Sequence, residues 1–337
     1  MSFNNHYEIL QVQPSADREV IEAAAKALLK KHHPDLGGRN TITSHIVQAK
    51  KVLTDTSQRA DFDARLRERL DNTIGPYKII RKLAEGGFGR VYEARHTLLG
   101  EKVCIKHSIN ISDYDKQLFL NEARAVWNLR HHSLPAVRDV MVLEDGSVAI
   151  VMTFIEGPTL AELAEEYKAK GGPNGEKDID PENVCWLMDR VLDGLRYMHW
   201  HGVVHGDVKP QNIIVQRDAH TCALVDFGLS SVRPDKNAST DGYTPAFASP
   251  EALKFKPLLP ESDLYSLGMT FIYAVGGDVN KKRVPMSLPQ PIREFISDLV
   301  VFDISNRPSW ERVDLVAKLR KIRLDVFGRE HTNLKKI

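Results

Sequence analysis

Two short motifs of this chain carry residue types that could perform chemistry together. The first is His-Gly-Asp-Val-Lys-Pro-Gln-Asn at residues 205–212, and the second is Asp-Phe-Gly at residues 226–228. Between them they supply two carboxylates, an amide and an ammonium: Asp207, Asp226, Asn212 and Lys209. In phosphoryl transfer one carboxylate takes the proton of the acceptor hydroxyl, while a second carboxylate and an amide hold magnesium. An ammonium neutralises the charge that develops. The residue types therefore indicate phosphoryl transfer.

The sequence between the two motifs predicts the element that brings them together. Apolar residues form two short runs, 213–215 and 223–225, and polar residues around Asp218 separate them. Short apolar runs with turn-forming residues between them are typical of two strands joined by a turn. A loop, this hairpin and a second loop would then hold the four side chains near one another.

Length and composition limit the fold and the partners. A chain of 337 residues permits two to three domains, and 42% hydrophobic with 27% charged residues is ordinary for a soluble globular protein. A net charge of +1 argues against a general nucleic-acid binder. The three cysteines are widely spaced and form no disulfide or zinc pattern, which indicates a reducing compartment.

No apolar run approaches the roughly 18 residues of a membrane span. The first residues also lack the charged and apolar segments of a signal peptide. We therefore expect a cytoplasmic protein without a membrane partner. The sequence does not indicate an oligomeric state.

The N-terminal zone is predicted to be helical up to about Leu70, with a small all-helical domain at residues 5–66. Ser15 is the expected N-cap of a helix that includes residues 23–31, which are rich in good helix formers. Pro34 ends this helix, and a second helical run is expected over residues 43–53. The two form a helical hairpin with a polar loop at its tip.

A polar linker is expected at residues 67–76, followed by a large zone at 77–326 and a polar tail at 327–337. The large zone opens with three β-type runs (77–83, 90–94 and 102–106) and becomes mainly helical from Pro181. A small β-rich part followed by a larger helical part predicts an α+β fold of two lobes with a cleft between them.

A glycine-rich segment joins the first two β-type runs. It reads Leu-Ala-Glu-Gly-Gly-Phe-Gly-Arg-Val at residues 83–91, and its glycines would let the backbone approach phosphates closely. Lys106 follows on the next strand and Glu122 on a helical run. A lysine on a half-buried strand needs a partner charge, which Glu122 could supply. Taken singly, Lys106 and Glu122 are better interpreted as a surface pair.

The order of these motifs resembles that of the eukaryotic-type serine/threonine protein kinases over residues 77–326. The resemblance implies a bilobal kinase fold that transfers the γ-phosphate of ATP, with Mg²⁺, to hydroxyl groups of a protein substrate. It implies that Asp207 is the catalytic base, that Lys209 contacts the γ-phosphate, and that Lys106 binds the α- and β-phosphates while Glu122 holds it. Asn212 and Asp226 would be the metal ligands.

The resemblance also implies an ATP pocket with Met152 as gatekeeper, Phe154 in the hinge beside adenine, and Val91 and Ile214 on the two faces of the base. The residues implied to bind ATP are Leu83, Ala84, Glu85, Gly86, Gly87, Phe88, Gly89, Arg90, Val91, Cys104, Lys106, Met152, Phe154 and Ile214. Outside this pocket, Arg307 would pair with Glu251, and Asp263 would support the catalytic loop.

The sequence departs from the family pattern in several places. Ala84 stands for the first glycine of the loop, and Cys104 for an alanine in the roof of the adenine pocket. Gly206 replaces the arginine that reads phosphate on the activation loop, which argues against activation gated by phosphorylation. The segment 276–291 is short, so the helix usual there is expected to be trimmed.

The N-terminal zone resembles a J domain of the DnaJ type. The tripeptide His33-Pro34-Asp35 follows a helix with Lys26 and Lys30. The resemblance implies that these five residues engage a DnaK-type chaperone. Two alternatives compete with this interpretation. The lysines could be only a solvated helix face, or the module could be a degenerate J fold reused for dimerisation or docking.

Several alternatives stay open for the whole chain. It could be a co-chaperone adaptor whose kinase fold is weakly active or inactive, although Lys106, Asp207, Asn212 and Asp226 are all present. The J domain could also regulate the kinase directly. Autophosphorylation is expected between Asp226 and Glu251, at Ser239 or Thr240 rather than at Thr244, which the family uses near the catalytic base.

Overall fold

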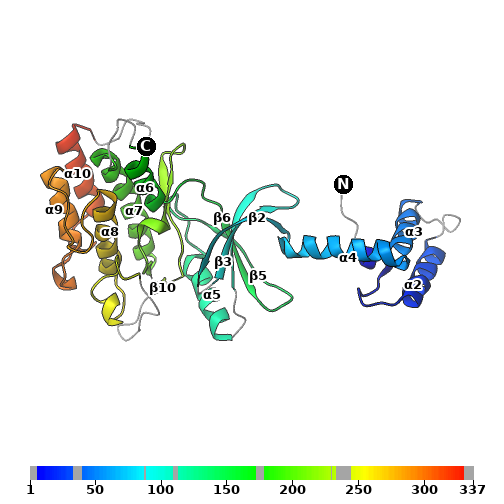
Figure 1. Cartoon of the computed structure of the whole chain (residues 1–337). Coiled ribbons are helices and arrows are strands. Elements are labelled where there is room, and N and C mark those ends of the chain that lie inside the picture. The colour runs from blue at the N-terminus through cyan, green and yellow to red at the C-terminus, as the bar shows by residue number, and fades with distance from the viewer. Residues whose placement is uncertain are drawn as a thin grey trace. The chain divides into compact units, whose positions relative to one another are not determined.

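The computed structural model describes residues 6–32, 40–86, 89–108, 113–171, 178–228, 230–232 and 244–329. The chain divides into two compact units, Met1–Ile79 and Ile80–Ile337. Figure 1 shows their helices and strands. Each unit is considered by itself below.

The first unit is helical, as the sequence predicts. Its described residues form the helices α1 (His6–Leu10), α2 (Arg18–Lys31), α3 (Asn40–Thr54) and α4 (Thr56–Asp71). The two predicted helical runs are confirmed as parts of α2 and α3. Their apolar stripes pack with Tyr7 and Leu10 of α1 around a core that includes Ile21, Ile46 and Leu53.

The start of α2 differs from the prediction. Asp17, and not Ser15, is the N-cap, because its side chain accepts a hydrogen bond of 3.0 Å from the backbone N–H of Val20. A capping side chain must reach the N–H two or three residues further on, and the carboxylate of Asp17 is the group placed to do so.

The expected linker, 67–76, has regular structure over most of its length. The helix α4 continues to Asp71, and the short strand β1 (Thr73–Ile74) pairs antiparallel with the start of β2, with Ile74 opposite Tyr77. This end of α4 agrees with the helical pattern predicted up to about Leu70.

The β-rich part of the second unit is the predicted small lobe. Its strands are β2 (Tyr77–Gly86), β3 (Gly89–His96), β4 (Lys102–His107), β5 (Val137–Val142) and β6 (Val148–Thr153), and α5 (Asp113–Val126) packs against β5 and β6. The sheet has the order β1-β2-β3-β4-β6-β5. All three predicted β-type runs are confirmed as strands.

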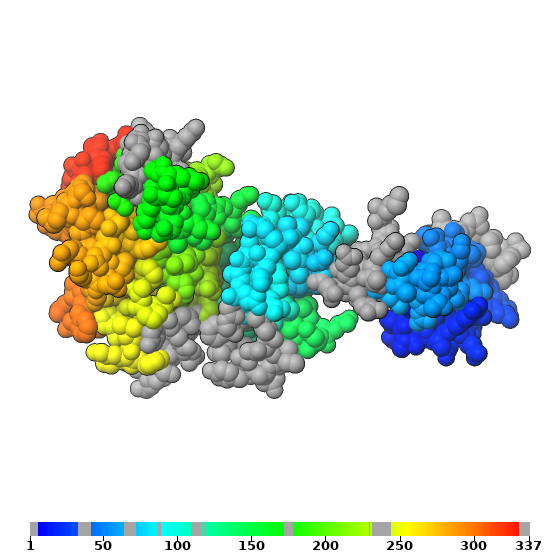
Figure 2. Space-filling model, viewed as in Figure 1, coloured from blue at the N-terminus to red at the C-terminus, as the bar shows by residue number. Residues whose placement is uncertain are grey.

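The helical part follows. Its helices are α6 (Leu160–Lys170), α7 (Pro181–Trp200), α8 (Pro260–Ala274), α9 (Gln290–Leu299) and α10 (Leu315–Phe327). Figure 2 shows the β-rich part, in cyan, directly against this helical part. One continuous hydrophobic core joins them, with Ile150 of β6 and Leu187 of α7 among its members. Among the described residues no helix is both long and apolar enough to cross a bilayer.

The described residues of the helical part also include two short antiparallel pairs of strands. The strands β8 (Ile213–Gln216) and β9 (Thr221–Leu224) form the predicted hairpin, with Ile213 opposite Leu224. The second pair is β7 (Val203–Val204) with β10 (Ser231–Val232). The hairpin therefore places residues 205–212 before its first strand and Asp226 just after its second.

The segment between α8 and α9 is described in full and contains no helix. It consists of turns and one antiparallel bridge between Asp278 and Arg283. This agrees with the expectation that the helix usual in this segment is trimmed.

The predicted polar tail, 327–337, is ordered at its start. Gly328 ends α10 with φ +70°, and both guanidinium nitrogens that Arg329 uses lie 2.6 Å from the Glu182 carboxylate. Sequence composition alone could not show this contact, because Glu182 is remote in the chain. Residues 330–337 lie outside the described part.

A buried ion pair ties the segment before α8 to the loop before α10. The Arg307 guanidinium, with no exposed surface, donates to Glu251 at 2.8 Å and to the carbonyl of Glu261 at 2.7 Å. Burial alone would raise the pKa of Glu251, but hydrogen bonds from Arg307 and from the hydroxyl of Ser262 hold it below its usual value. The expected pairing of these two residues is confirmed.

Loss of this arginine should be costly. Arg307→Ala leaves the Glu251 carboxylate buried without its cation, so we expect the free energy of unfolding to fall by about 3–5 kcal/mol. The matched control is Lys318→Ala, whose partner Asp298 is about half exposed, and which should cost less than about 1 kcal/mol. Chemical denaturation measures both, and equal losses would contradict the account.

Candidate active site

A buried ammonium joins three parts of the second unit. The Nζ atom of Lys106, on β4, lies 2.8 and 2.7 Å from the two carboxylate oxygens of Glu122 on α5. It lies 2.9 Å from Oδ1 of Asp226, which follows β9. Burial alone would lower the pKa of Lys106, but the two carboxylates raise it above its ordinary value. The structure thus brings together three of the predicted site residues in one ionic group.

The loop of Asp226 is held in a conformation that few side chains adopt. Its φ is +65°, in the left-handed region. The backbone N–H of Val225 donates to the carbonyl of Asn212 at 2.8 Å, which joins the two motifs directly. The neighbouring backbone therefore fixes where the Asp226 carboxylate lies.

The carboxylate of Asp207 is the centre of a second group. It accepts hydrogen bonds from the ammonium of Lys209 at 2.6 Å, from the hydroxyl of Thr244 at 2.9 Å and from the amide of Asn212 at 3.2 Å. Lys209 also donates to Thr244 at 3.0 Å. Thr244 lies beside Asp207, as the family resemblance implied.

Asp263, on α8, supports the loop that carries Asp207. Its buried carboxylate accepts from the backbone N–H of His205 at 2.7 Å and of Gly206 at 2.8 Å. Burial alone would raise the pKa of Asp263, but the hydrogen bond from His199 helps to hold it below its usual value. Gly206 has φ +81°, so a glycine suits the position at which the family has an arginine. The supporting role expected of Asp263 is confirmed.

Two residues of this support were missed by sequence reasoning. The indole of Trp310 donates to Nδ1 of His199 at 2.8 Å, and Nε2 of His199 lies 2.8 Å from Asp263. Because an indole only donates, Nδ1 must accept, and Nε2 carries the proton given to Asp263. No local motif marks either residue, since they are separated by more than a hundred positions.

The buried ring of His205 links the two motifs. Its Nδ1 accepts from the backbone N–H of Asp207, so its Nε2 donates to the carbonyl of Val225, each at 3.2 Å. Burial lowers the pKa of His205. The neutral ring therefore acts as a fixed brace between the loops.

The predicted phosphate loop is described in part, since Gly87 and Phe88 lie outside the described residues. Gly89 has φ +153°, and a Cβ there would lie 2.4 Å from the carbonyl oxygen of His107. Glu85 pairs with Lys82 of the same strand at 2.5 Å and with Arg90 of β3 at 2.9 Å. The contacts of these residues with ATP stay a prediction.

The residues expected around adenine lie on adjoining strands. Val91 is opposite Lys106 in the β3–β4 pair, and Cys104 is opposite Met152 in the β4–β6 pair. Burial raises the pKa of the Cys104 thiol to about 12, so the thiol is protonated and unreactive at neutral pH.

Ile214, the residue expected on the other face of adenine, belongs to β8. It forms an isolated bridge with Thr159, in the segment that follows the expected hinge. At Gly157, also in that segment, a Cβ would lie 2.2 Å from the carbonyl oxygen of Val215, so only glycine fits. β8 is thus held close to the hinge, while the adenine contact of Ile214 stays a prediction.

The motif of the N-terminal unit is described only at its margins. His33, Pro34 and Asp35 lie outside the described residues, as do Ser239 and Thr240, the expected autophosphorylation sites. Lys26 and Lys30 are exposed on α2, one turn apart.

Comparison with known families agrees with the two groups of motifs. A model described as "Protein kinase domain" matches residues 77–315, and one described as "DnaJ domain" matches residues 5–63. The first covers most of the chain, which therefore belongs to the protein kinase family and carries a DnaJ domain at its N-terminal end.

Individual relatives carry the names of serine/threonine-protein kinases. The chain is 31% identical to pkn2 of Myxococcus xanthus over 235 residues, which is 66% of this chain and 26% of pkn2. It is 23% identical to CLA4 of Saccharomyces cerevisiae over 310 residues, 80% of this chain and 36% of CLA4. It is 29% identical to nekl-2 of Caenorhabditis elegans over 197 residues, which is 57% of this chain and 55% of nekl-2. The chain thus spans less than two thirds of each relative's length.

Proposed function

We propose that the chain is an ATP-dependent serine/threonine protein kinase, with a kinase domain at 77–326 and a J domain at 5–66. The observation that carries this proposal is the assembled pair of ionic groups, Lys106 with Glu122 and Asp226, and Asp207 with Lys209. Kinases act mainly by positioning phosphates and stabilising charge, and these groups supply both functions.

Asn212 and Asp226 each have an oxygen atom that the hydrogen bonds described above do not use, and these atoms are suitable ligands for a magnesium ion. Both hydrogen bonds of Asn212 use its Nδ2, which leaves the amide oxygen for a cation, and Lys106 engages only Oδ1 of Asp226. Mg²⁺ prefers oxygen ligands of this kind. Bound with ATP, the ion would neutralise charge on the phosphates.

Asp207 is the proposed base for the acceptor hydroxyl. The hydroxyl of Thr244 already donates to it at 2.9 Å, so a hydroxyl can approach this carboxylate with suitable geometry. The neighbouring ammonium of Lys209 would offset negative charge on the phosphoryl group as it is transferred.

Replacing the base tests this function. Asp207→Asn should lower γ-phosphate transfer to casein or to the chain itself by about 10²–10⁴-fold, the usual contribution of a positioned base. Asn keeps the side-chain shape, so the melting temperature should change little. Label from γ-labelled ATP measures the transfer.

The matched control is Asp218→Asn, an exposed aspartate in the turn between β8 and β9, which should keep parental activity. If Asp207→Asn transferred phosphate as fast as this control, the assignment of the base would be wrong. Loss of transfer in both variants would point to a fold defect instead.

We further propose that the J domain engages a DnaK-type chaperone in the cytoplasm through His33, Pro34 and Asp35 together with Lys26 and Lys30. The match to the DnaJ family supports this, and so does the exposure of both lysines on one side of α2. The competing proposal is an adaptor that uses the chaperone but transfers little phosphate, which the absence of an arginine at Gly206 favours.

Chaperone ATPase assays test the J domain independently of kinase chemistry. The full chain should stimulate ATP hydrolysis by a DnaK-type protein, and His33→Gln should weaken this about tenfold or more, equivalent to about 1.4 kcal/mol. His45→Gln, at an exposed position on α3, is the control. Equal stimulation by the two variants would show that the tripeptide does not act on the chaperone.

A further inference from the structure

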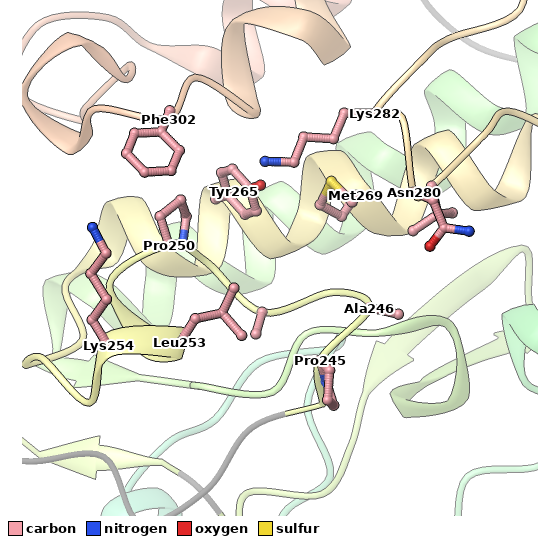
Figure 3. A pocket seen from close by; sticks show the side chains of 12 residues that line it. Pro245, Ala246, Pro250, Leu253, Lys254, Tyr265, Met269, Asn280, Lys282 and Phe302 are labelled. Atoms are coloured by element: carbon pink, nitrogen blue, oxygen red, sulfur yellow. The ribbon is translucent and has the colours of Figure 1, made fainter.

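A groove in the helical part lies beside the segment that leaves the active site. Its volume is about 250 Å³, and Figure 3 shows the side chains around it. The segment 245–254, the helix α8, the turns before α9 and the exposed ring of Phe302 all contribute to its lining.

The groove combines an apolar lining with two cations. Leu253 and Met269 supply apolar surface, and Phe302 is 63% exposed. The ammonium of Lys254 lies 5.3 Å from the centre of the Phe302 ring, and that of Lys282 lies 5.9 Å from the same centre. Both side chains are directed toward this ring (Figure 3). Within the described part of the chain, neither ammonium has a carboxylate within 4.0 Å.

The position of Lys282 is built into the backbone. Asp278 and Arg283 exchange two backbone hydrogen bonds of 3.0 and 2.9 Å, which close a tight turn. Within it Lys282 adopts φ +53°, a conformation uncommon for a lysine. Its neighbour Lys281 instead pairs with Asp278 at 3.5 Å. The turn therefore presents one lysine to the groove and engages the other in an ion pair.

The groove begins one residue after Thr244, whose side chain contacts the proposed catalytic base Asp207. Pro245 and Ala246 line it and directly follow Thr244, whose hydroxyl bonds to Asp207. An extended peptide advances roughly 3.3 Å per residue. A substrate with its hydroxyl at Asp207 would therefore reach the groove within a few residues.

We propose that this groove binds the part of the protein substrate that flanks the phosphorylated hydroxyl, and that it selects an apolar side chain accompanied by carboxylates. The proposal rests on the kinase function proposed above. Charge complementarity decides the occupant, because two unpaired ammonium groups beside an aromatic ring favour an acidic peptide. The chain's own C-terminal residues include Lys335 and Lys336 and would be repelled.

A positional peptide library tests the selection. The library contains serine peptides in which Asp or Glu, together with one Leu, is placed at each position around the serine in turn. These peptides should be phosphorylated faster than matched peptides with Lys in place of the acidic residue. In the double variant Lys254→Glu with Lys282→Glu, the preference for acidic peptides should fall by about 5- to 30-fold, the effect of two exposed ion pairs. Salt at 0.5 M should weaken the parental preference in the same direction.

Lys281→Glu is the positional control, since it makes the same charge change as Lys282→Glu at the neighbouring residue, which does not line the groove. It should keep the parental preference. The proposal is overturned if the double variant keeps the preference, if the control loses it equally, or if the parent has none. It is also overturned if the double variant changes the oligomeric state, because the groove would then join two copies of the chain.

A binding measurement separates this proposal from the kinase function itself. Fluorescence anisotropy measures peptide binding and requires no catalysis. The probes are the library's best acidic peptide and its Lys counterpart. If no peptide is phosphorylated, Asp-Leu-Glu and Lys-Leu-Lys peptides are used instead. Tighter binding of the acidic peptide by the parent than by the double variant supports the groove even if phosphate transfer fails. Equal binding rejects the groove even if phosphate transfer succeeds.

Discussion

The active site depends on one buried cation, the ammonium of Lys106, between the carboxylates of Glu122 and Asp226. Removing such groups from water costs several kcal/mol per ion, and good geometry is needed to offset the cost. Distances of 2.7–2.9 Å to both partners meet that need. The three residues come from the sheet, from α5 and from the loop after β9, so the ion pairs join elements that are remote in sequence.

The charge of this group has a consequence for nucleotide binding. One ammonium and two carboxylates carry a net charge of −1, which would repel the phosphates of free ATP. A divalent cation at Asp226 and Asn212 would reverse the sign. Nucleotide and metal are therefore expected to bind together, and Lys106 to act on phosphates only when the cation accompanies them.

A second buried charge holds the catalytic loop. The Asp263 carboxylate receives two backbone N–H groups and the proton of His199, which Trp310 orients in turn. The loop thus has an anchor in α8 that involves no phosphate. This arrangement is consistent with a loop that is formed without phosphorylation.

Local motifs were sufficient to predict the strands that carry the site, the β8–β9 hairpin, and the approach of Lys106 to Glu122. They succeed because each of these signals extends over only a few consecutive residues. The signals are glycine-rich loops, alternating apolar residues and charged motifs. The His199–Trp310 contact and the Arg329–Glu182 pair could not be predicted, because each forms only when distant segments pack together.

The two lysines of the groove illustrate the same limit. Lys281 and Lys282 are indistinguishable in the sequence, yet a single backbone turn pairs one with Asp278 and presents the other to an aromatic ring. The substrate selection proposed for the groove therefore depends on backbone conformation and not on a motif.

The central claim is that Lys106 and its two carboxylates form a nucleotide site that requires a divalent cation. Isothermal titration calorimetry with a non-hydrolysable ATP analogue tests it most directly, for the parent and for Lys106→Met, with and without Mg²⁺. We predict binding by the parent only with Mg²⁺, and at least about tenfold weaker binding by Lys106→Met, since charge-assisted hydrogen bonds contribute about 1.5–3 kcal/mol. Equal affinities for the two proteins, or binding by the parent that is unaffected by Mg²⁺, would contradict the account.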